Sequence, residues 1–126
     1  PLTTPLKFRI SRYMELNYAV AGLAALAQES RLKVFRLLVR AGPRGMSAGD
    51  IARELAIPAN TMSSHLGILS RAGLLSSKKH GRSLIYAVDL EGTRKLLLYL
   101  IEDCCRGKPD VCEPLIESMM WECCAN

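Results

Sequence analysis

Apolar residues recur every three or four positions along most of this chain, and this spacing predicts helices. The first such stretch covers residues 15–28 and consists mainly of alanine and leucine, a composition that suits close helix packing. The second runs from Ser30, which can serve as an N-cap, to Gly42-Pro43, where glycine followed by proline stops a helix. The patterned part of the chain therefore opens with two consecutive helices.

Two shorter helical patterns follow. Ser47 can cap the first, and Ile57-Pro58 ends it, because a residue that precedes proline is pushed out of the helical region. The second spans about residues 60–72, and Gly73 is its expected stop. Its apolar face carries three residues: Met62, Leu66 and Leu69. Two short helices joined by a tight turn are the helix-turn-helix pattern.

The outward face of the second short helix carries small polar side chains near its start: Asn60, Thr61, Ser63, Ser64 and His65. This end also has free backbone N–H groups and the positive end of the helix dipole, which favour phosphate. Short polar side chains let the backbone approach a DNA groove, where Asn, Ser and Thr can read base edges. On this pattern alone, a DNA-recognition helix and an ordinary solvated surface helix are equally open.

Two strand-like runs, residues 74–79 and 83–88, flank the sequence His80-Gly81-Arg82. The second run alternates with a period of two, and Gly81 supplies the positive φ of a tight hairpin turn. Cations gather at the tip: Lys78, Lys79, His80 and Arg82. Such a tip is typical of a wing beside a recognition helix, and we expect Lys79 and Arg82 to bind DNA phosphates. A basic hairpin without a partner is the weaker interpretation.

A leucine-rich helix is predicted from about residue 91 to residue 104. Its apolar face is broad: Leu90, Leu96, Leu97, Leu98, Leu100, Ile101 and Cys105. A terminal helix of a small domain cannot bury that much apolar surface alone, and such an excess usually marks an interface. With the alanine-rich first helix, it predicts a two-fold dimer that places two recognition helices on successive major grooves. The expected fold is therefore mainly α with a small β-hairpin, a winged helix-turn-helix whose dimer is formed by the first and last helices.

Composition fits one small DNA-binding domain and excludes several other classes. The 126 residues suffice for a single domain, and 17 basic against 12 acidic residues give a net charge of +5, which favours a polyanionic partner. No apolar run reaches membrane-spanning length and no secretory signal pattern appears, so we expect a cytoplasmic protein without a membrane partner. No histidine is placed to activate a nucleophilic cysteine, and no phosphate-binding glycine loop is present, so we do not expect an enzyme.

Five cysteines lie near the end of the sequence: Cys104, Cys105, Cys112, Cys123 and Cys124. Their odd number and clustering argue against a disulfide scaffold and favour metal binding or redox chemistry. Thiolates select soft metals, and Gly107 and Pro109 favour a turn that brings the third sulfur back toward the first pair. Cysteines packed as small hydrophobes and a thiol redox switch are the alternatives. The final pair is expected to be accessory.

The order of these elements and several motifs resemble the ArsR/SmtB family of metal-responsive winged-helix repressors. The motifs are Thr61-Met62-Ser63-Ser64-His65-Leu66 with Leu69, Ala72-Gly73-Leu74, Gly81-Arg82 with Tyr86, and Glu29-Ser30-Arg31-Leu32 with Ile51-Ala52. The resemblance covers about residues 15–105. It implies a homodimer without a permanent cofactor that occludes operator DNA until a ligand lowers its DNA affinity.

Within that family, the sequence looks like the arsenite-responsive branch. The family's site with cysteines in the first helix of the helix-turn-helix is absent, since residues 50–55 contain none. The zinc site with histidines on the last helix is absent too, because the only histidines are His65 and His80. The resemblance then implies that arsenic(III) or antimony(III) binds Cys104, Cys105 and Cys112 as inducer. A redox-sensing repressor, a sensor of another thiophilic metal and a constitutive DNA-binding protein remain alternatives.

These interpretations divide the chain into three parts. We expect a basic arm over residues 1–14, a winged helix-turn-helix domain for DNA binding and dimerisation over residues 15–105, and a cysteine-containing tail over residues 106–126.

Overall fold

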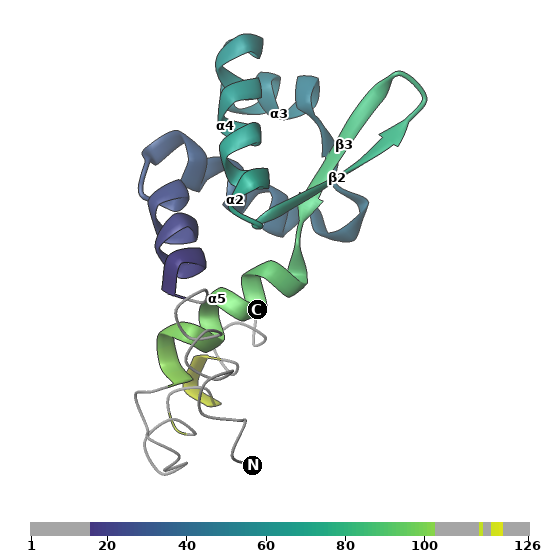
Figure 1. The fold of residues 1–126 in the computed structure, drawn as a ribbon. Coiled ribbons are helices and arrows are strands. Elements are labelled where there is room, and N and C mark those ends of the chain that lie inside the picture. Colours follow the sequence, from purple (N-terminus) through teal and green to yellow (C-terminus); the bar gives the residue numbers. More distant parts are fainter. Residues whose placement is uncertain (1–15, 103–113, 115–116, 120–126) are drawn as a thin grey trace, which may run out of the picture.

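The computed structural model describes residues 16–102, 114 and 117–119 (Figure 1). After a first helix over residues 16–26, the elements are α2 (Glu29–Ala41), the 3-10 turn η1 (Gly42–Arg44), β1 (Met46–Ser47), α3 (Ala48–Leu55), α4 (Ala59–Arg71), β2 (Leu75–His80), β3 (Ser83–Val88) and α5 (Leu90–Glu102). Figure 1 shows α3 and α4 next to each other, with the β2–β3 hairpin projecting beside them. The predicted mainly helical winged helix-turn-helix fold is confirmed.

One apolar core holds the helix-turn-helix to α2. Each helix contributes the stripe that its helical period predicts, and seven large side chains are fully buried: Val34, Leu38, Ile51, Met62, Leu66, Leu69 and Leu74. The predicted inward residues of α4 are thus confirmed. Burial of a leucine or methionine side chain stabilises a fold by roughly 1.5–3 kcal/mol, so this stripe fixes the orientation of α4 and leaves its opposite face to solvent.

The small sheet has three antiparallel strands in the order β1-β3-β2. In the hairpin, Leu75 pairs with Val88 at one end and His80 with Ser83 at the other, so only two residues form the turn. Strand β1 was not predicted, because two residues carry no alternation and its pairing of Met46 with Tyr86 is distant in sequence.

Local hydrogen bonds explain where α2 and α3 begin. The hydroxyl of Ser47 accepts the N–H of Asp50 at 3.1 Å, which confirms the predicted cap of α3. The predicted cap of α2 at Ser30 is wrong. The chain enters the helix earlier, and the side-chain oxygen of Gln28 accepts the N–H of Arg31 at 2.8 Å. Gln28 is an uncommon cap, and Ser30 therefore lies within the first turn of α2.

Gly73 ends α4, as predicted. Its φ is +80°, and its N–H donates to the carbonyl of Ser70 at 3.0 Å, while the next N–H, from Leu74, donates to Leu69 at 3.0 Å. This pair of bonds satisfies carbonyls that the helix end would leave open, and glycine is favoured at the left-handed position. The chain can then turn sharply from α4 into β2.

The first helix, the end of α4 and the start of α5 meet in one tight junction. A methyl group added to Gly92 would overlap the carbonyl oxygen of Gly73, and one added to Gly73 would overlap the hydroxyl of Tyr18. Leu96 lies one turn further along α5, and a Cβ atom added to Gly22 of the first helix would lie only 3.3 Å from its side chain. Leu96 is therefore buried against the first helix, and does not widen the outer face of α5 as the sequence pattern suggested.

The outer faces of these two helices remain apolar and exposed. Six large side chains lie there: Leu16, Val20 and Leu23 on the first helix, and Leu97, Leu98 and Leu100 on α5. The first helix and α5 together are called the helix pair below. Its exposed apolar face agrees with the excess of leucine that the sequence indicated.

Candidate nucleic-acid interface

A tight turn joins α3 to α4. Ala56 adopts a left-handed conformation with φ 54°, and the N–H of Ile57 donates to the carbonyl of Ala52 at 3.0 Å, which closes the end of α3. Pro58 then precedes α4, and its carbonyl accepts the N–H of Met62 at 2.8 Å. The first turn of α4 contains no acidic residue and no side-chain cap. The positive end of the helix therefore faces solvent, and the N–H groups of Ala59 and Asn60 have no hydrogen-bond partner among the described residues and can bind an anion.

The predicted DNA-contacting residues of α4 lie mostly on its exposed face. Asn60, Thr61, Ser63 and Ser64 are all exposed. Asn60 uses its side-chain oxygen to accept the N–H of Thr61 at 2.9 Å, which leaves its amide N–H₂ group as a donor. His65 differs, because it is half-buried and its Nδ1 is buried without a hydrogen-bond partner among the described residues. It sits at the flank of this face.

Two further residues extend the exposed face of α4 and were missed by sequence reasoning. Gly67 and Arg71 follow Asn60, Ser63 and Ser64 at the helical spacing of three or four, and Arg71 is exposed. The Arg71 guanidinium lies over Gly67, with Nη1 3.1 Å from the position a Cβ would occupy there. Applying the helical period outward as well as inward would have found both. Gly67 removes bulk from the middle of the face, and Arg71 places a cation at its end.

The hairpin tip presents the predicted cations to solvent. Gly81 has φ +65° and is followed by Arg82 in the two-residue turn, and no side chain at Gly81 would meet another atom within 4 Å. Lys79 and Arg82 are exposed and make no ion pair with any residue in the described part of the chain. These cations are free to bind phosphate groups of a polyanion.

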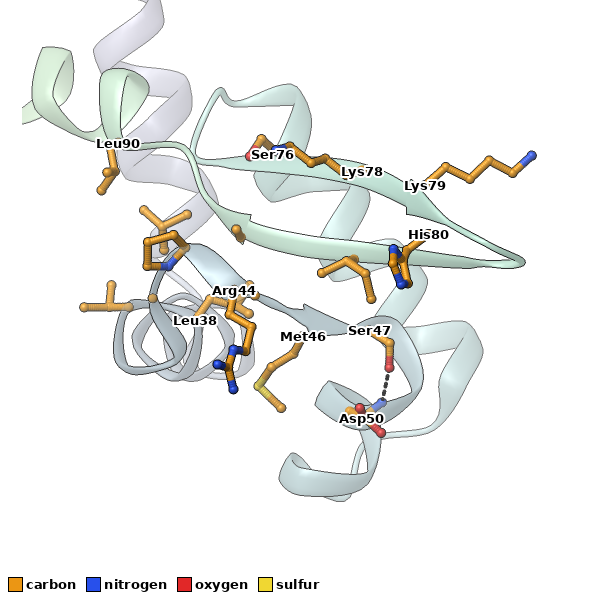
Figure 2. Close-up of a pocket in the computed structure, with 17 residues that line it drawn as sticks. Leu38, Arg44, Met46, Ser47, Asp50, Ser76, Lys78, Lys79, His80 and Leu90 are labelled. Atoms are coloured by element: carbon orange, nitrogen blue, oxygen red, sulfur yellow. Dashed lines mark hydrogen bonds between the residues drawn. The ribbon is translucent and has the colours of Figure 1, made fainter.

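The pairing register gives the hairpin two chemically different faces. Lys79 pairs with Leu84 on one face, and Lys78 pairs with Ile85 on the other, since successive side chains of a strand alternate. On the Ile85 face lies a groove of about 710 Å³, bounded by the hairpin, the end of α2, η1, β1 and the starts of α3 and α5 (Figure 2). Lys79 and His80 also line the groove; in Figure 2 the end of the Lys79 side chain extends outward, whereas His80 lies on the side of Ser47 and Asp50.

The predicted metalloid ligands Cys104, Cys105 and Cys112 lie outside the described residues, as do Cys123 and Cys124. Within residues 16–102, 114 and 117–119, no group of three histidine, cysteine or carboxylate side chains is close enough to hold a metal ion. Over the same residues, no helix combines the length and apolar character needed to cross a membrane.

Comparison with known proteins identifies regulators of transcription. A family model described as a helix-turn-helix domain matches residues 26–77. The transcriptional activator HlyU of Vibrio cholerae is 31% identical over 77 residues, which are 60% of this chain and 68% of HlyU. The uncharacterised regulator Rv0081 of Mycobacterium tuberculosis is 29% identical over 73 residues, 57% of this chain. The match spans only 61% of the length of Rv0081.

Solved structures show the same architecture. An ArsR-like transcriptional regulator from Rhodococcus superposes with a TM-score of 0.62 at 25% identity, covering 86% of this chain and 95% of that one. The homodimeric winged helix-turn-helix domain Mb0332 of Mycobacterium bovis superposes with a TM-score of 0.59 at 22% identity, covering 73% and 84% of the two chains. The second likeness shows the fold alone. The proteins with which the chain aligns are regulators and not enzymes, in agreement with the absence of catalytic motifs.

Proposed function

The chain belongs to the winged helix-turn-helix transcriptional regulators of the ArsR and HlyU type, and from this premise we propose that it is a metalloid-responsive repressor. In this proposal a homodimer binds operator DNA and is released when arsenic(III) or antimony(III) binds Cys104, Cys105 and Cys112. The observation that carries the DNA-binding part is the exposed polar face of α4 beside a hairpin with unpaired cations.

Contact with DNA follows from the positions of these two surfaces. The start of α4 offers backbone N–H groups to phosphate, and Asn60, Ser63 and Ser64 face outward, where they can meet base edges in the major groove. The hairpin would then follow the adjacent backbone with Lys79 and Arg82. Sequence preference would reside in α4, and most of the salt-dependent affinity in the hairpin.

Dimer formation is supported by the exposed apolar face of the helix pair. Val20 is 56% exposed and Leu97 is 51% exposed, and covering such a face with a second copy removes apolar surface from water. The solved neighbour Mb0332 is described as homodimeric. A two-fold dimer would present two α4 helices to successive major grooves.

The inducer is proposed from the chemistry of the donors. Three thiolates with no histidine suit a three-coordinate thiophilic ion such as arsenic(III) better than zinc, which prefers four ligands in a closed site. The cysteines follow α5 directly in the sequence, and α5 begins at the junction where Gly92 contacts the end of α4. A change at the end of α5 would therefore reach the DNA-contacting helix, which couples the two sites.

The test is release of DNA by the full-length protein. DNA that binds is first selected from a random-sequence pool, and its affinity is then measured by fluorescence anisotropy with and without arsenite. We expect arsenite to weaken binding by about 10- to 100-fold, the usual range of coupling between sites. Cys104→Ser, Cys105→Ser and Cys112→Ser should keep DNA affinity and lose the response, whereas Cys123→Ser with Cys124→Ser is the matched control and should retain it.

Separate arms distinguish the alternatives. Release by peroxide and not by arsenite would replace the metalloid sensor with a redox sensor. Loss of DNA binding in the serine variants would assign the cysteines a structural role. Because HlyU is named a transcriptional activator, the direction of regulation is tested by in vitro transcription from a promoter that carries the selected sequence. Repression by the free dimer is expected, and activation would overturn it.

A further inference from the structure

Of the described residues that the proposed repressor uses, only Lys79 also lines the groove on the Ile85 face of the hairpin. One side of the groove is the face of the sheet that carries Ile85 and Ala87. Its other side is formed by the end of α2, η1 and β1 (Figure 2). At about 710 Å³, its volume lies in the range of roughly 300–1,000 Å³ that small-molecule sites occupy.

The lining of the groove is mainly apolar although it opens to solvent. Val39 at the end of α2 is 54% exposed, and Leu90 at the start of α5 is 73% exposed. Pro43, Ile85 and Ala87 continue this surface across η1 and β3. Val39 lies on α2, outside the helix pair, whereas Leu90 begins α5 and shares a side of that helix with Leu97, seven residues further on. A hydrocarbon body placed here would remove both from water.

Cations dominate the polar part of the lining. Arg44 from η1 and Lys78 from β2 both line the groove, and neither makes an ion pair with another described residue. The carboxylate that also lines it, Asp50, is already paired with Arg53. The balance of charge therefore favours an anion, and the apolar surface between the cations favours a hydrocarbon attached to it.

We propose that this groove binds an amphipathic organic anion, a carboxylate with a hydrocarbon body of about ten carbon atoms. Arg44 and Lys78, which line the groove from η1 and from β2, supply the positive charge that attracts the carboxylate, and Val39, Ile85 and Leu90 contact the hydrocarbon. A phosphate group without an apolar part would leave these three side chains exposed, and a quaternary ammonium would face like charge. Occupation also engages Lys78, which lies on the strand that carries the DNA-contacting tip. The ligand therefore lowers affinity for DNA, and only this last consequence rests on the proposed function.

Binding is tested without DNA, using ¹⁵N-labelled full-length protein and decanoate. Saturable shifts are expected at the amides of Val39, Ala87 and Leu90. Decyltrimethylammonium, with the same chain and the opposite charge, should bind at least about tenfold more weakly, as should hexanoate, which leaves part of the apolar surface uncovered. Equal binding of the two long-chain probes would overturn the assigned anion, and absence of saturable shifts would overturn the site.

Substitutions locate the site. Val39→Asp and Leu90→Asp each place a carboxylate among the apolar side chains and should weaken decanoate binding by about tenfold or more. Leu90→Asp also puts an acidic group in the first turn of α5, where the helix dipole favours it, so the fold is retained. Leu32→Asp is the matched control, because Leu32 is 44% exposed on α2, seven residues before Val39, and does not line the groove. Equal loss in all three variants would overturn the assignment.

Two further measurements distinguish the proposed ligand from a protein partner in the groove, and failure of the site from failure of the proposed function. Sedimentation of Val39→Asp is expected to match the unsubstituted protein, and a changed oligomeric state would make the groove a protein interface instead.

Decanoate should weaken DNA binding about three- to tenfold in the unsubstituted protein and not in Val39→Asp, each compared with its own affinity without ligand. If decanoate binds and DNA affinity is unchanged, the site stands without the regulatory consequence. If the protein binds no DNA, the proposed function fails and the NMR result still decides the site.

Discussion

Two regions of the molecule, the helix-turn-helix with its hairpin and the helix pair, differ in whether their large apolar side chains are buried or exposed. In α4, Met62, Leu66 and Leu69 are completely buried, and the opposite face is polar. In the helix pair, small residues such as Ala19 and Gly22 face the core, while Val20 and Leu97 remain exposed. The first region buries its large apolar side chains and presents a polar surface suited to a polyanion. The second buries small residues and Leu96 and leaves most of its large apolar side chains exposed.

This contrast shows that a helix can be fixed in position without burying large side chains. The helix pair is held by backbone proximity at Gly92 and by the contact of Gly22 with Leu96, and it needs few large side chains in the core. Its leucines are then available for association. The helix-turn-helix instead holds α4 in one orientation with large buried side chains, as the proposed contact of its outward residues with DNA requires.

The largest expected effect on DNA affinity comes from making the exposed face of the helix pair polar, like the exposed face of α4. Val20→Glu combined with Leu97→Glu places carboxylates on the exposed apolar face and should convert the proposed dimer to a folded monomer. Affinity for DNA should fall about 100-fold or more, because two linked contacts become one. Sedimentation gives the oligomeric state and fluorescence anisotropy gives the affinity. Leu32→Glu, on an exposed apolar residue outside the pair, should remain dimeric, and a dimeric double variant would refute this interface.

A substitution at the junction between the two regions should have the next largest effect. In Gly92→Ala, the added methyl meets the carbonyl of Gly73, which is backbone and cannot rotate away. We expect the free energy of unfolding to fall by about 3 kcal/mol, at the upper end of the cost of overpacking. Urea denaturation at one fixed protein concentration measures it. Gly81→Ala is the control, since that methyl meets nothing and costs only about 1 kcal/mol in backbone strain. Equal losses would mean that the junction is not tight.

The smallest expected effect comes from removing one positive charge from α4 and, for comparison, one from α5. Arg71→Ala removes the cation at the end of the exposed face of α4 and should weaken DNA binding about tenfold. It should also lower the slope of log affinity against log salt by about one, as expected when one phosphate contact is lost. Arg94→Ala on α5 is the control, because Arg94 is exposed and lies 3.5 Å from Glu91 in an ion pair. A similar change in both variants would indicate that only net charge matters.

Elements with a strong local signal could be predicted from the sequence. The period of Met62, Leu66 and Leu69 gave the inner face of α4, and Gly81 gave the hairpin turn. Strand β1 and the inward packing of Leu96 could not be predicted, because each depends on a partner distant in sequence, Tyr86 for the strand and Gly22 for the leucine. Local periodicity also placed Leu96 among its exposed neighbours, since adjacent leucines on one helix look alike until the position of the next helix is known.

The candidate site also contains some residues that a local sequence signal predicted and others that it did not. Asn60, Ser63 and Ser64 were predicted because small polar residues at a helix start have a known use. Arg71 was missed because it lies about three turns from Asn60, and the helical period was applied only to the apolar residues of α4 and not to its outward face. The groove beside the hairpin has no sequence signature, as its lining comes from α2, η1, the sheet and the start of α5.

The contact of Gly73 with Gly92 also sets how motion passes through the molecule. Helices α4 and α5 each contain 13 residues, so each is a rod of about 20 Å, and the two meet at this point backbone to backbone. A joint without side chains has no rotamers with which to absorb a displacement. Beyond Gly92, α5 continues for ten residues, about 15 Å, so a shift of about 2 Å at its far end corresponds to a rotation of about 8° about this contact. An equal rotation of α4 would carry its DNA-facing start, about 20 Å away, through about 3 Å, well beyond the range of roughly 0.5 Å over which hydrogen-bond distances vary.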